Sequence, residues 1–345
     1  VATRLGVVSK IRERDVHTTP TPRWGGVAKW IGMAVTFAMV HHLSLVGKSF
    51  TRESIGIFLA ATFLVLLGMV DDRFELDALT KLAGQALAAG ILLLFGIQVL
   101  WLPINGVITL PPSIGQLVTV LIVLITINAV NFIDGLDGLA AGIVAISGAA
   151  FFAFAYLLAV IYGFSRAGSP SLITAIIIGV CIGFLPHNAY PAKIFMGDSG
   201  SMLLGLLLAA SAITLTGQID PNAIAEEKLG PTLLPLALPL AVLAIPLIDL
   251  FSAIIRRLRA GKSPFSSDKE HIHHRIMRAG NTQSRTALIM YFWTATIAFP
   301  VSISAFTPLW VAGCVFAVML IFTIAFQRQR PEFHKAQKAE QVITA

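Results

Sequence analysis

Two adjacent carboxylates, Asp71 and Asp72, stand in the stretch GMVDDRFELD, directly after a long run of apolar residues. That run predicts a membrane helix that ends near the pair, and a helix C-terminus already carries partial negative charge. Two further negative charges are unfavourable there unless something positive offsets them, as a bound divalent cation would. Asp77 is explained more simply as the N-cap of the next helix. Asp71 and Asp72 are therefore candidates for a catalytic or metal-binding role.

A second polar cluster lies in NAVNFIDGLDGLAAG, residues 128–142, at the expected junction of two membrane helices. If helical geometry persists, Asn131 and Asp134 are i,i+3 neighbours, and so are Asp134 and Asp137. The glycines between them let the backbone approach a ligand closely. A polar turn capped by Asp137 is the simpler interpretation. Two amides, Asn128 and Asn131, with two acids exceed what a turn needs, so we expect a functional site.

The stretch PHNAYPAKIFMGDSGSMLLG, residues 186–205, combines a polar loop with the start of another apolar helix. Asp198 or Ser199 is expected to cap that helix. The same segment leaves backbone N–H groups at the helix N-terminus, a favourable place for a phosphate. An aspartate beside a phosphate suits an oxygen ligand of Mg²⁺. Asp198 is therefore the predicted metal ligand.

Three histidines, His271, His273 and His274, occur with Arg275 in the basic loop SPFSSDKEHIHHRIMRAG. Histidines have no packing role in a solvated loop. Zinc would want cysteines or matched carboxylates, which the loop lacks, so contact with phosphate or diphosphate is favoured. A second basic stretch, RERDVHTTPTPRWGG, carries Arg23. It is either a topogenic charge cluster or a shaped loop that holds an anion.

Asp249 lies inside an apolar stretch, seven residues before Arg256. An acid within a membrane span is a functional candidate by default. An ion pair with Arg256 or Arg257 explains it equally well. An ion-coupled transporter would place several acids near the midplane on broken helices. Only Asp249 is deep in this sequence, so the transporter is the weaker alternative.

The elements that position these residues are membrane helices. The 345-residue chain is 56% hydrophobic and 12% charged, with a mean hydropathy of +0.81, whereas a soluble protein of this length needs far more polar surface. Cys181 and Cys314 lie in apolar runs, which argues against a disulfide framework or zinc cluster. The net charge of +7 is explained by topogenic loops, and no nucleic-acid partner is expected.

We predict an all-α polytopic membrane protein with about ten transmembrane helices and its active site at the cytoplasmic face. The spans are expected at residues 25–46, 54–70, 79–101, 114–130, 138–163, 171–187, 199–217, 231–255, 285–306 and 308–327. Most of the 25 lysines and arginines fall in one set of alternate loops, which places both ends of the chain in the cytoplasm. The clustered aspartates and histidines fall on that same side.

Five stretches in order, PTPRWGG, DDRFELD, NAVNFIDGLDGLAAG, FMGDSGS and SPFSSDKEHIHHRIMRAG, resemble the polyprenyl-phosphate N-acetylhexosamine-1-phosphate transferase superfamily. The histidine loop and the DDRF turn are similar to its UDP-GlcNAc branch rather than its phospho-MurNAc-pentapeptide branch. The resemblance implies a Mg²⁺-dependent enzyme of the bacterial plasma membrane, with Mn²⁺ as the alternative ion. It would transfer GlcNAc-1-phosphate from UDP-GlcNAc to undecaprenyl or decaprenyl phosphate, release UMP, and begin a cell-envelope polysaccharide pathway.

Carried over by motif, the resemblance implies catalytic roles for Asp71, Asp72, Asp134, Asp137, His271, His273 and His274. It implies a metal site at Asp198. We predict Asp72 as a second metal ligand, and substrate contacts by Arg23, Asn128, Asn131, Asn188, Lys193 and Arg275. We expect one integral-membrane domain over residues 1–330 and a basic cytoplasmic tail over 331–345, and a homodimer is left open. Family members usually have a helix before PTPRWGG, so an eleventh span is expected ahead of Val1.

One further enzyme class also combines aspartates, Mg²⁺ and a polyprenyl substrate, namely the intramembrane prenyltransferases. These would need two Asp-rich boxes in which aspartate recurs at three- or four-residue steps. DDRFELD lacks that step, and the histidine loop would have no function there. The prenyltransferase is therefore the least favoured alternative.

Overall fold

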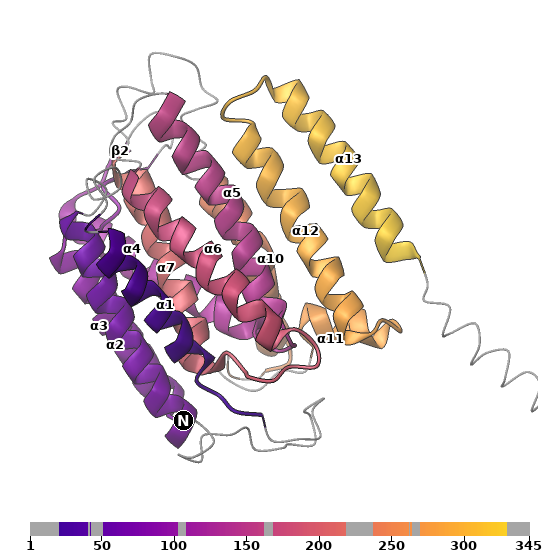
Figure 1. The fold of residues 1–345 in the computed structure, drawn as a ribbon, viewed down its shortest axis with the longest axis horizontal. Coiled ribbons are helices and arrows are strands. Elements are labelled where there is room, and N and C mark those ends of the chain that lie inside the picture. The colour runs from indigo at the N-terminus through magenta and orange to yellow at the C-terminus, as the bar shows by residue number, and fades with distance from the viewer. Residues whose placement is uncertain are drawn as a thin grey trace, which may run out of the picture.

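Apolar helices dominate the computed structural model, which describes residues 21–40, 42, 51–102, 108–161, 168–218, 237–261, 263 and 270–329. Seven of the described helices are long and apolar enough to cross a membrane. They are α2 (Arg52–Phe74), α4 (Pro112–Ile133), α5 (Leu139–Ile161), α6 (Gly168–Asn188), α7 (Gly197–Gln218), α12 (Gln283–Ile303) and α13 (Leu309–Arg328). Two shorter apolar helices, α1 (Gly25–Val40) and α3 (Ala78–Leu94), pack beside them (Figure 1). A helical, multi-pass membrane protein is confirmed, and the count of ten spans stays a prediction.

The expected span over residues 79–101 is too long. α3 ends at Leu94 because the chain turns at Gly96, whose φ of 87° favours glycine. A two-stranded antiparallel ladder follows, formed by β1 (Trp101–Leu102) and β2 (Ile108–Thr109). A turn and a short strand therefore replace the last part of the predicted helix.

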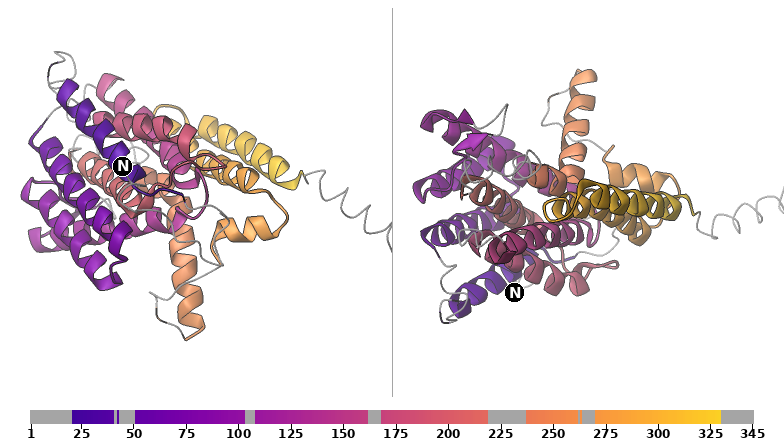
Figure 2. Two further views of the ribbon diagram at one scale, coloured as in Figure 1. Left: turned by 60° about the horizontal axis from the view of Figure 1, so that its bottom comes forward. Right: turned by 90° about the horizontal axis from the view of Figure 1, so that it is seen from above.

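The expected span over residues 231–255 begins outside the described part of the chain. Its described portion is helical at residues 237–242 and continues as α10 (Ala244–Arg259), which carries Asp249 and ends with three arginines. α10 projects from the helix bundle in both views of Figure 2. Residues 1–20, the end of the first expected span and the tail over 331–345 also lie outside the described residues.

α7 is the central helix and is buried along nearly its whole length (Figure 1). Small residues allow the neighbouring helices to come close, as is usual for helix packing in membranes. A Cβ atom at Gly205 would lie 2.6 Å from the Cα of Ile127 on α4, and one at Gly200 would lie 3.1 Å from the Cα of Gly26 on α1. α7 therefore contacts α1, α2, α4 and α6, and its N-terminal end meets several elements at once.

Candidate active site

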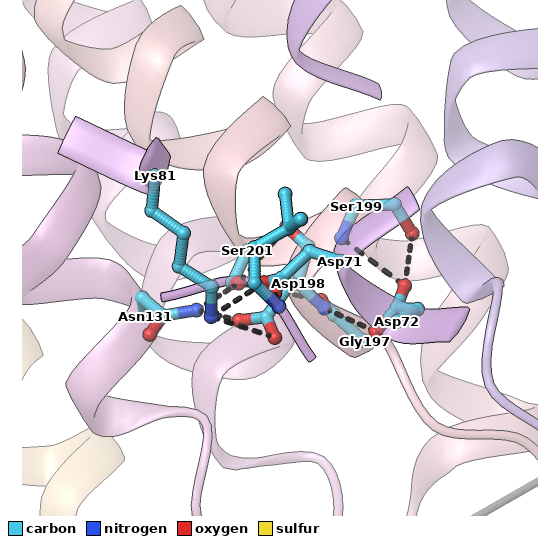
Figure 3. Close-up of polar contacts among 9 residues, drawn as sticks. Asp71, Asp72, Lys81, Asn131, Gly197, Asp198, Ser199 and Ser201 are labelled. Carbon is cyan, nitrogen blue, oxygen red and sulfur yellow. Dashed lines mark hydrogen bonds and ion pairs between the residues drawn. The ribbon is translucent and has the colours of Figure 1, made fainter. Parts of the chain in front are cut away.

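Asp72, near the C-terminal end of α2, caps the N-terminus of α7 (Figure 3). Its Oδ1 accepts a hydrogen bond from the backbone N–H of Asp198 at 2.9 Å. Its Oδ2 accepts from the Ser199 hydroxyl at 2.9 Å and the Ser199 N–H at 3.3 Å. Gly68 makes this approach possible, because a Cβ there would lie 2.3 Å from the Cα of Ser199. Two helices distant in sequence thus share one cap.

This cap corrects two expectations from the sequence. Neither Asp198 nor Ser199 caps α7 with its own side chain, because Asp72 supplies the acceptor from α2. The N–H groups of Asp198 and Ser199 are also not free for a phosphate, because both donate to Asp72. The partial positive charge at the start of α7 offsets the Asp72 carboxylate. A metal ion is therefore not needed to explain why an acid stands at that end of α2.

Lys81, on the first turn of α3, joins Asp71 to Asp198 (Figure 3). Its ammonium forms an ion pair with Asp71 Oδ2 and lies 3.4 Å from Asp198 Oδ2. The other oxygen of Asp71 accepts a hydrogen bond from the Leu76 N–H at 2.8 Å, just beyond the end of α2. The three charged side chains come from three helices, and the lysine reduces the repulsion between the two carboxylates.

Asn131, near the end of α4, holds the other side of Asp198. Its side-chain N–H donates to Asp198 Oδ1 and to the Ser201 hydroxyl, the latter at 2.8 Å. The Asp198 side chain is 24% exposed, whereas that of Asp71 is 1% exposed. Asp198 is therefore the carboxylate of this cluster that an incoming ligand can reach.

The carboxylates at this site suit a magnesium ion that a phosphate helps to hold. Within the described residues, no three His, Cys, Asp or Glu side chains are arranged to hold a metal by themselves. Mg²⁺ does not require such a set, because it is commonly bound by one or two carboxylates together with substrate phosphates. The partly exposed Asp198 fits that role. Asp72 fits it less well, because both of its oxygens already accept hydrogen bonds from α7.

Asp134 ends α4 beside this cluster and is only partly exposed. Burial raises the pKa of the Asp134 carboxyl to about 7, while the neighbouring Lys29 ammonium opposes that rise. The charge of Arg23 acts in the same direction as Lys29, and the carboxylates of Asp198 and Asp72 act against it. Asp134 therefore interacts electrostatically with these four charged groups, as expected for a group inside one polar site.

Asp137 and Asn188 tie two loops together. The Asp137 carboxylate accepts a hydrogen bond from the Ala192 N–H at 2.9 Å. Asn188 accepts from the Gly138 N–H at 3.2 Å and donates to the Ile194 carbonyl at 2.9 Å. The segment between α4 and α5 is thereby fixed to the loop that leads into α7. These contacts give both residues a structural function in addition to any contact with a ligand.

The histidines are not in a solvated loop, as the sequence had suggested. His271 and His273 are buried, and Arg275 is exposed. His271 precedes the short helix α11 (Ile272–Arg278), which contains His273. The His273 ring lies against the α4–α5 segment, where a Cβ at Gly135 would be 2.6 Å from its Nε2. Burial and the adjacent His274 lower the pKa of His273 to about 3. The cluster is thus packed against the segment that carries Asp134.

Asp198 accepts a hydrogen bond from Asn131, donates its backbone N–H to Asp72, and is joined to Asp71 through Lys81. Asp134 and the histidines lie next to this cluster. Among the described contacts, none joins three of the predicted substrate residues to this cluster. Asn128 donates to Gln85 of α3 at 2.7 Å, and Lys193 and Arg275 are exposed.

Sequence reasoning missed Lys81, which is not among the residues predicted for the site. A signal was available, because Lys81 lies in the first turn of α3, where the helix N-terminus disfavours a cation. A charge in a locally unfavourable position is the same signal that marked Asp71 and Asp72.

Residues 54–216 match the family model described as glycosyl transferase family 4. Over 313 residues the chain is 41% identical to the decaprenyl-phosphate N-acetylglucosaminephosphotransferase of Mycobacterium tuberculosis, covering 89% of this chain and 78% of the relative. A similar protein of the same name in Mycolicibacterium smegmatis is 41% identical, with coverage of 94% and 82%. The undecaprenyl-phosphate alpha-N-acetylglucosaminyl 1-phosphate transferase of Escherichia coli is 31% identical, with coverage of 94% and 83%.

Proposed function

Because the chain belongs to glycosyl transferase family 4, we propose that it transfers GlcNAc-1-phosphate from UDP-GlcNAc to a membrane polyprenyl phosphate. The products would be polyprenyl-diphospho-GlcNAc and UMP. The family and the phosphotransferase relatives make it a glycosyl-1-phosphate transferase, and the sugar and lipid come from the names of those relatives. A phospho-MurNAc-pentapeptide transferase is the second candidate, and none of these relatives carries that name.

The observation that carries this proposal is the convergence of Asp71, Asp198 and Lys81 from three helices at one end of the bundle. A water-soluble sugar nucleotide and a lipid phosphate can meet only where the membrane ends. Acids at the ends of membrane-length helices suit such a reaction. Acids near the centre of the spans would instead favour transport.

The reaction joins two anionic phosphates, so electrostatics dominate its barrier. An oxygen of the lipid phosphate forms a bond to the phosphorus that carries GlcNAc, and the bond from that phosphorus to the oxygen of UMP breaks. A phosphate monoester has a second pKa of about 6, so the attacking group is already mostly dianionic at neutral pH. Positioning and charge stabilisation therefore matter more than removal of a proton.

The side chains at the site have separable functions in this scheme. Lys81 offers a cationic donor to phosphate oxygens where it now bridges Asp71 and Asp198. Asp71, anchored by the Leu76 N–H, orients the incoming lipid phosphate through Lys81. The histidines beside the α4–α5 segment supply donors to the diphosphate.

Mg²⁺, for which Mn²⁺ is the expected substitute, would neutralise the diphosphate and the charge that develops on UMP. Asp198 would hold it, because this carboxylate is the exposed one of the cluster. Asp72 would act mainly by fixing the start of α7, and with it the backbone of Asp198.

Mass analysis of products from a panel of UDP-sugars and polyprenyl phosphates, incubated with the purified full chain and Mg²⁺, tests the proposal. We expect UMP and a polyprenyl-diphospho-GlcNAc from UDP-GlcNAc, and no product from UDP-MurNAc-pentapeptide. Transfer from the pentapeptide nucleotide alone would replace this function with the second candidate. UMP release without any lipid acceptor would instead indicate an aspartyl-phosphate intermediate.

We also propose that the site faces the cytoplasm, from the distribution of basic residues among the loops. UDP-GlcNAc does not cross a bilayer, so sealed vesicles of known orientation can test the side. Inverted membrane vesicles should turn over added UDP-GlcNAc without detergent. Right-side-out vesicles should need detergent, and the reverse pattern would place the site outside.

A further inference from the structure

Asp249 on α10 and His271 ahead of α11 form a buried pair, and Asp249 has no role in the proposed reaction scheme. Asp249 Oδ2 lies 2.9 Å from His271 Nδ1. Asp249 Oδ1 accepts a hydrogen bond from the Ile272 N–H at 2.8 Å. Asp249 is 0% exposed and His271 is 8% exposed. Asp249 thus takes two partners from the histidine segment, and the ion pair with Arg256 or Arg257 that the sequence suggests stays a prediction.

The two contacts of Asp249, with His271 and with the Ile272 N–H, also determine the state of the His271 ring. A carboxylate that is already accepting from the Ile272 N–H can also accept the Nδ1–H of His271. That hydrogen bond fixes which ring nitrogen carries the proton, and it leaves Nε2 as the atom available to another group. The same logic orients a histidine by a buried aspartate in other enzymes. Asp249 therefore sets both the orientation and the tautomer of His271.

The residues packed around His271 connect it to the candidate active site. Its ring lies 5.6 Å from the ring of Phe132 on α4 and 5.6 Å from the nearly parallel ring of His273. His273 in turn packs against Gly135, the residue after Asp134. The Arg257 guanidinium lies over the Phe132 ring, 5.3 Å from its centre. The histidine is thus enclosed by groups that adjoin the acidic site.

We propose that Asp249 is a positioning residue for phosphoryl transfer. It accepts the Nδ1–H of His271 and offsets the positive charge of the ring when Nε2 also carries a proton, so that the Nε2–H donates to a phosphate oxygen. This inference rests on the proposed function. Asp249 itself touches no substrate in this scheme. It acts at a distance through one histidine, and its loss should appear in the turnover of bound substrates rather than in their binding.

Three variants of the full chain test this pairing: Asp249→Asn, His271→Asn and the double variant. Asparagine keeps the size of Asp249 and can still accept from the Ile272 N–H, but it is uncharged and cannot offset a positive charge on the His271 ring. We expect Asp249→Asn to lower kcat for UMP release at least about 100-fold, the usual cost of losing one preorganised donor to a developing negative charge. The KM for UDP-GlcNAc should stay within about threefold.

The double variant decides whether the two residues act together. If Asp249 works through His271, the double variant should be no slower than His271→Asn alone. A merely structural Asp249 would give losses that multiply, and that result would overturn the proposal, as would a kcat of Asp249→Asn within about threefold of wild type. Glu270→Gln is the matched control, because it neutralises a neighbouring acid whose ion pair with Arg278 is exposed, and it should keep wild-type kcat.

A spectroscopic measurement tests the pair without any Asp249 variant and without turnover. Solid-state NMR of ¹⁵N-histidine-labelled protein in liposomes, assigned by the signal lost in His271→Asn, should show a proton on Nδ1. An unprotonated Nδ1 would overturn the proposal even if the enzyme transfers GlcNAc-1-phosphate normally. A protonated Nδ1 in a chain that transfers nothing would contradict the proposed function and would still support the Asp249–His271 contact.

Discussion

The Asp72 carboxylate accepts the hydroxyl hydrogen of Ser199 at 2.9 Å and thereby links the end of α2 to the start of α7. Opposite helix termini meet here, so a negative side chain satisfies the exposed N–H groups of a different helix. The same contact fixes the backbone of Asp198, which is the exposed carboxylate of the site. Stability and activity should therefore depend on Asp72 together.

Asp72→Ala should lower both the thermal stability and the transfer rate. The substitution removes an N-cap, worth about 1–2 kcal/mol, and leaves N–H groups of α7 without an acceptor. Thermal unfolding in detergent and the rate of UMP release would be measured on the same preparation. We expect a lower midpoint and a rate reduced by at least about 100-fold, the usual cost of disturbing a preorganised site.

Asp77→Ala provides the matched control for Asp72. Asp77 caps α3 locally through the N–H groups of Leu79 and Thr80, both at 3.0 Å, and it is exposed. Its loss should cost some stability and leave the transfer rate within a fewfold of wild type. Equal losses of activity in both variants would show that capping alone matters, and that Asp72 has no special place in the site.

Lys81→Met should reduce transfer on the order of 100-fold, as removal of one stabilising donor does in other enzymes. The same variant should bind Mg²⁺ more tightly without substrate, because Asp71 and Asp198 lose the ammonium between them. The rise in melting temperature on adding Mg²⁺ measures this, since a ligand stabilises the state that binds it. The exposed Arg73→Met on α2 should behave like wild type. A smaller Mg²⁺ response in Lys81→Met than in wild type would contradict the assignment.

Gly142→Ala should disturb the segment that carries Asp134 and Asp137. A Cβ at Gly142 would lie 2.1 Å from the ring of Tyr291, whose hydroxyl donates to the Gly138 carbonyl at 2.6 Å. We expect a clear loss of stability and of transfer, and a partial recovery of stability when Tyr291→Ala is added. Gly179→Ala is the control, because nothing lies within 4 Å of its Cβ. Alanine there should be neutral or stabilising by about 0.5–1 kcal/mol. A normal melting temperature for Gly142→Ala would refute this packing.

Stability should decrease as the pH is lowered, because of His273. Its pKa is lowered to about 3 in the folded protein by burial, against about 6.5 in an unfolded chain. Between these values the unfolded state binds a proton that the folded state does not, so stability rises with pH by up to about 1.4 kcal/mol per unit. Melting temperatures of wild type should therefore drop between pH 7 and pH 5 more than those of His273→Asn. The exposed His187→Asn should keep the wild-type dependence, and parallel curves for all three proteins would rule His273 out.

Much of the fold could be predicted from the sequence because each membrane helix is a continuous apolar run. α2, α4, α6 and α7 were expected within a few residues of where they lie. The end of α3 could not be predicted this way, because the residues after Leu94 are also apolar and their turn and strand pairing depend on Gly96 and on a partner strand. Apolar composition predicts burial, and it does not distinguish a helix from a short strand.

The acidic residues of the site could be identified, but not their partners. Capping rules are local, and they pointed to Asp198 or Ser199 for α7, whereas the acceptor comes from Asp72, 126 residues earlier. The burial of His273 was likewise invisible, since it depends on Gly135 leaving room for the ring. Both contacts are set by how helices pack. A single sequence gives the chemistry of each segment and not the pairing between segments.

Paired measurement of UMP and lipid-linked sugar from radiolabelled UDP-GlcNAc, with and without polyprenyl phosphate, tests the central claim most directly. The purified chain with Mg²⁺ should give the two products in equal amounts and only when the lipid phosphate is present. Asp198→Asn should abolish both, while Asp77→Asn should leave both near wild type. Full transfer by Asp198→Asn, or UMP formed without a lipid product, would contradict a transferase site built around the acids of α2 and α7.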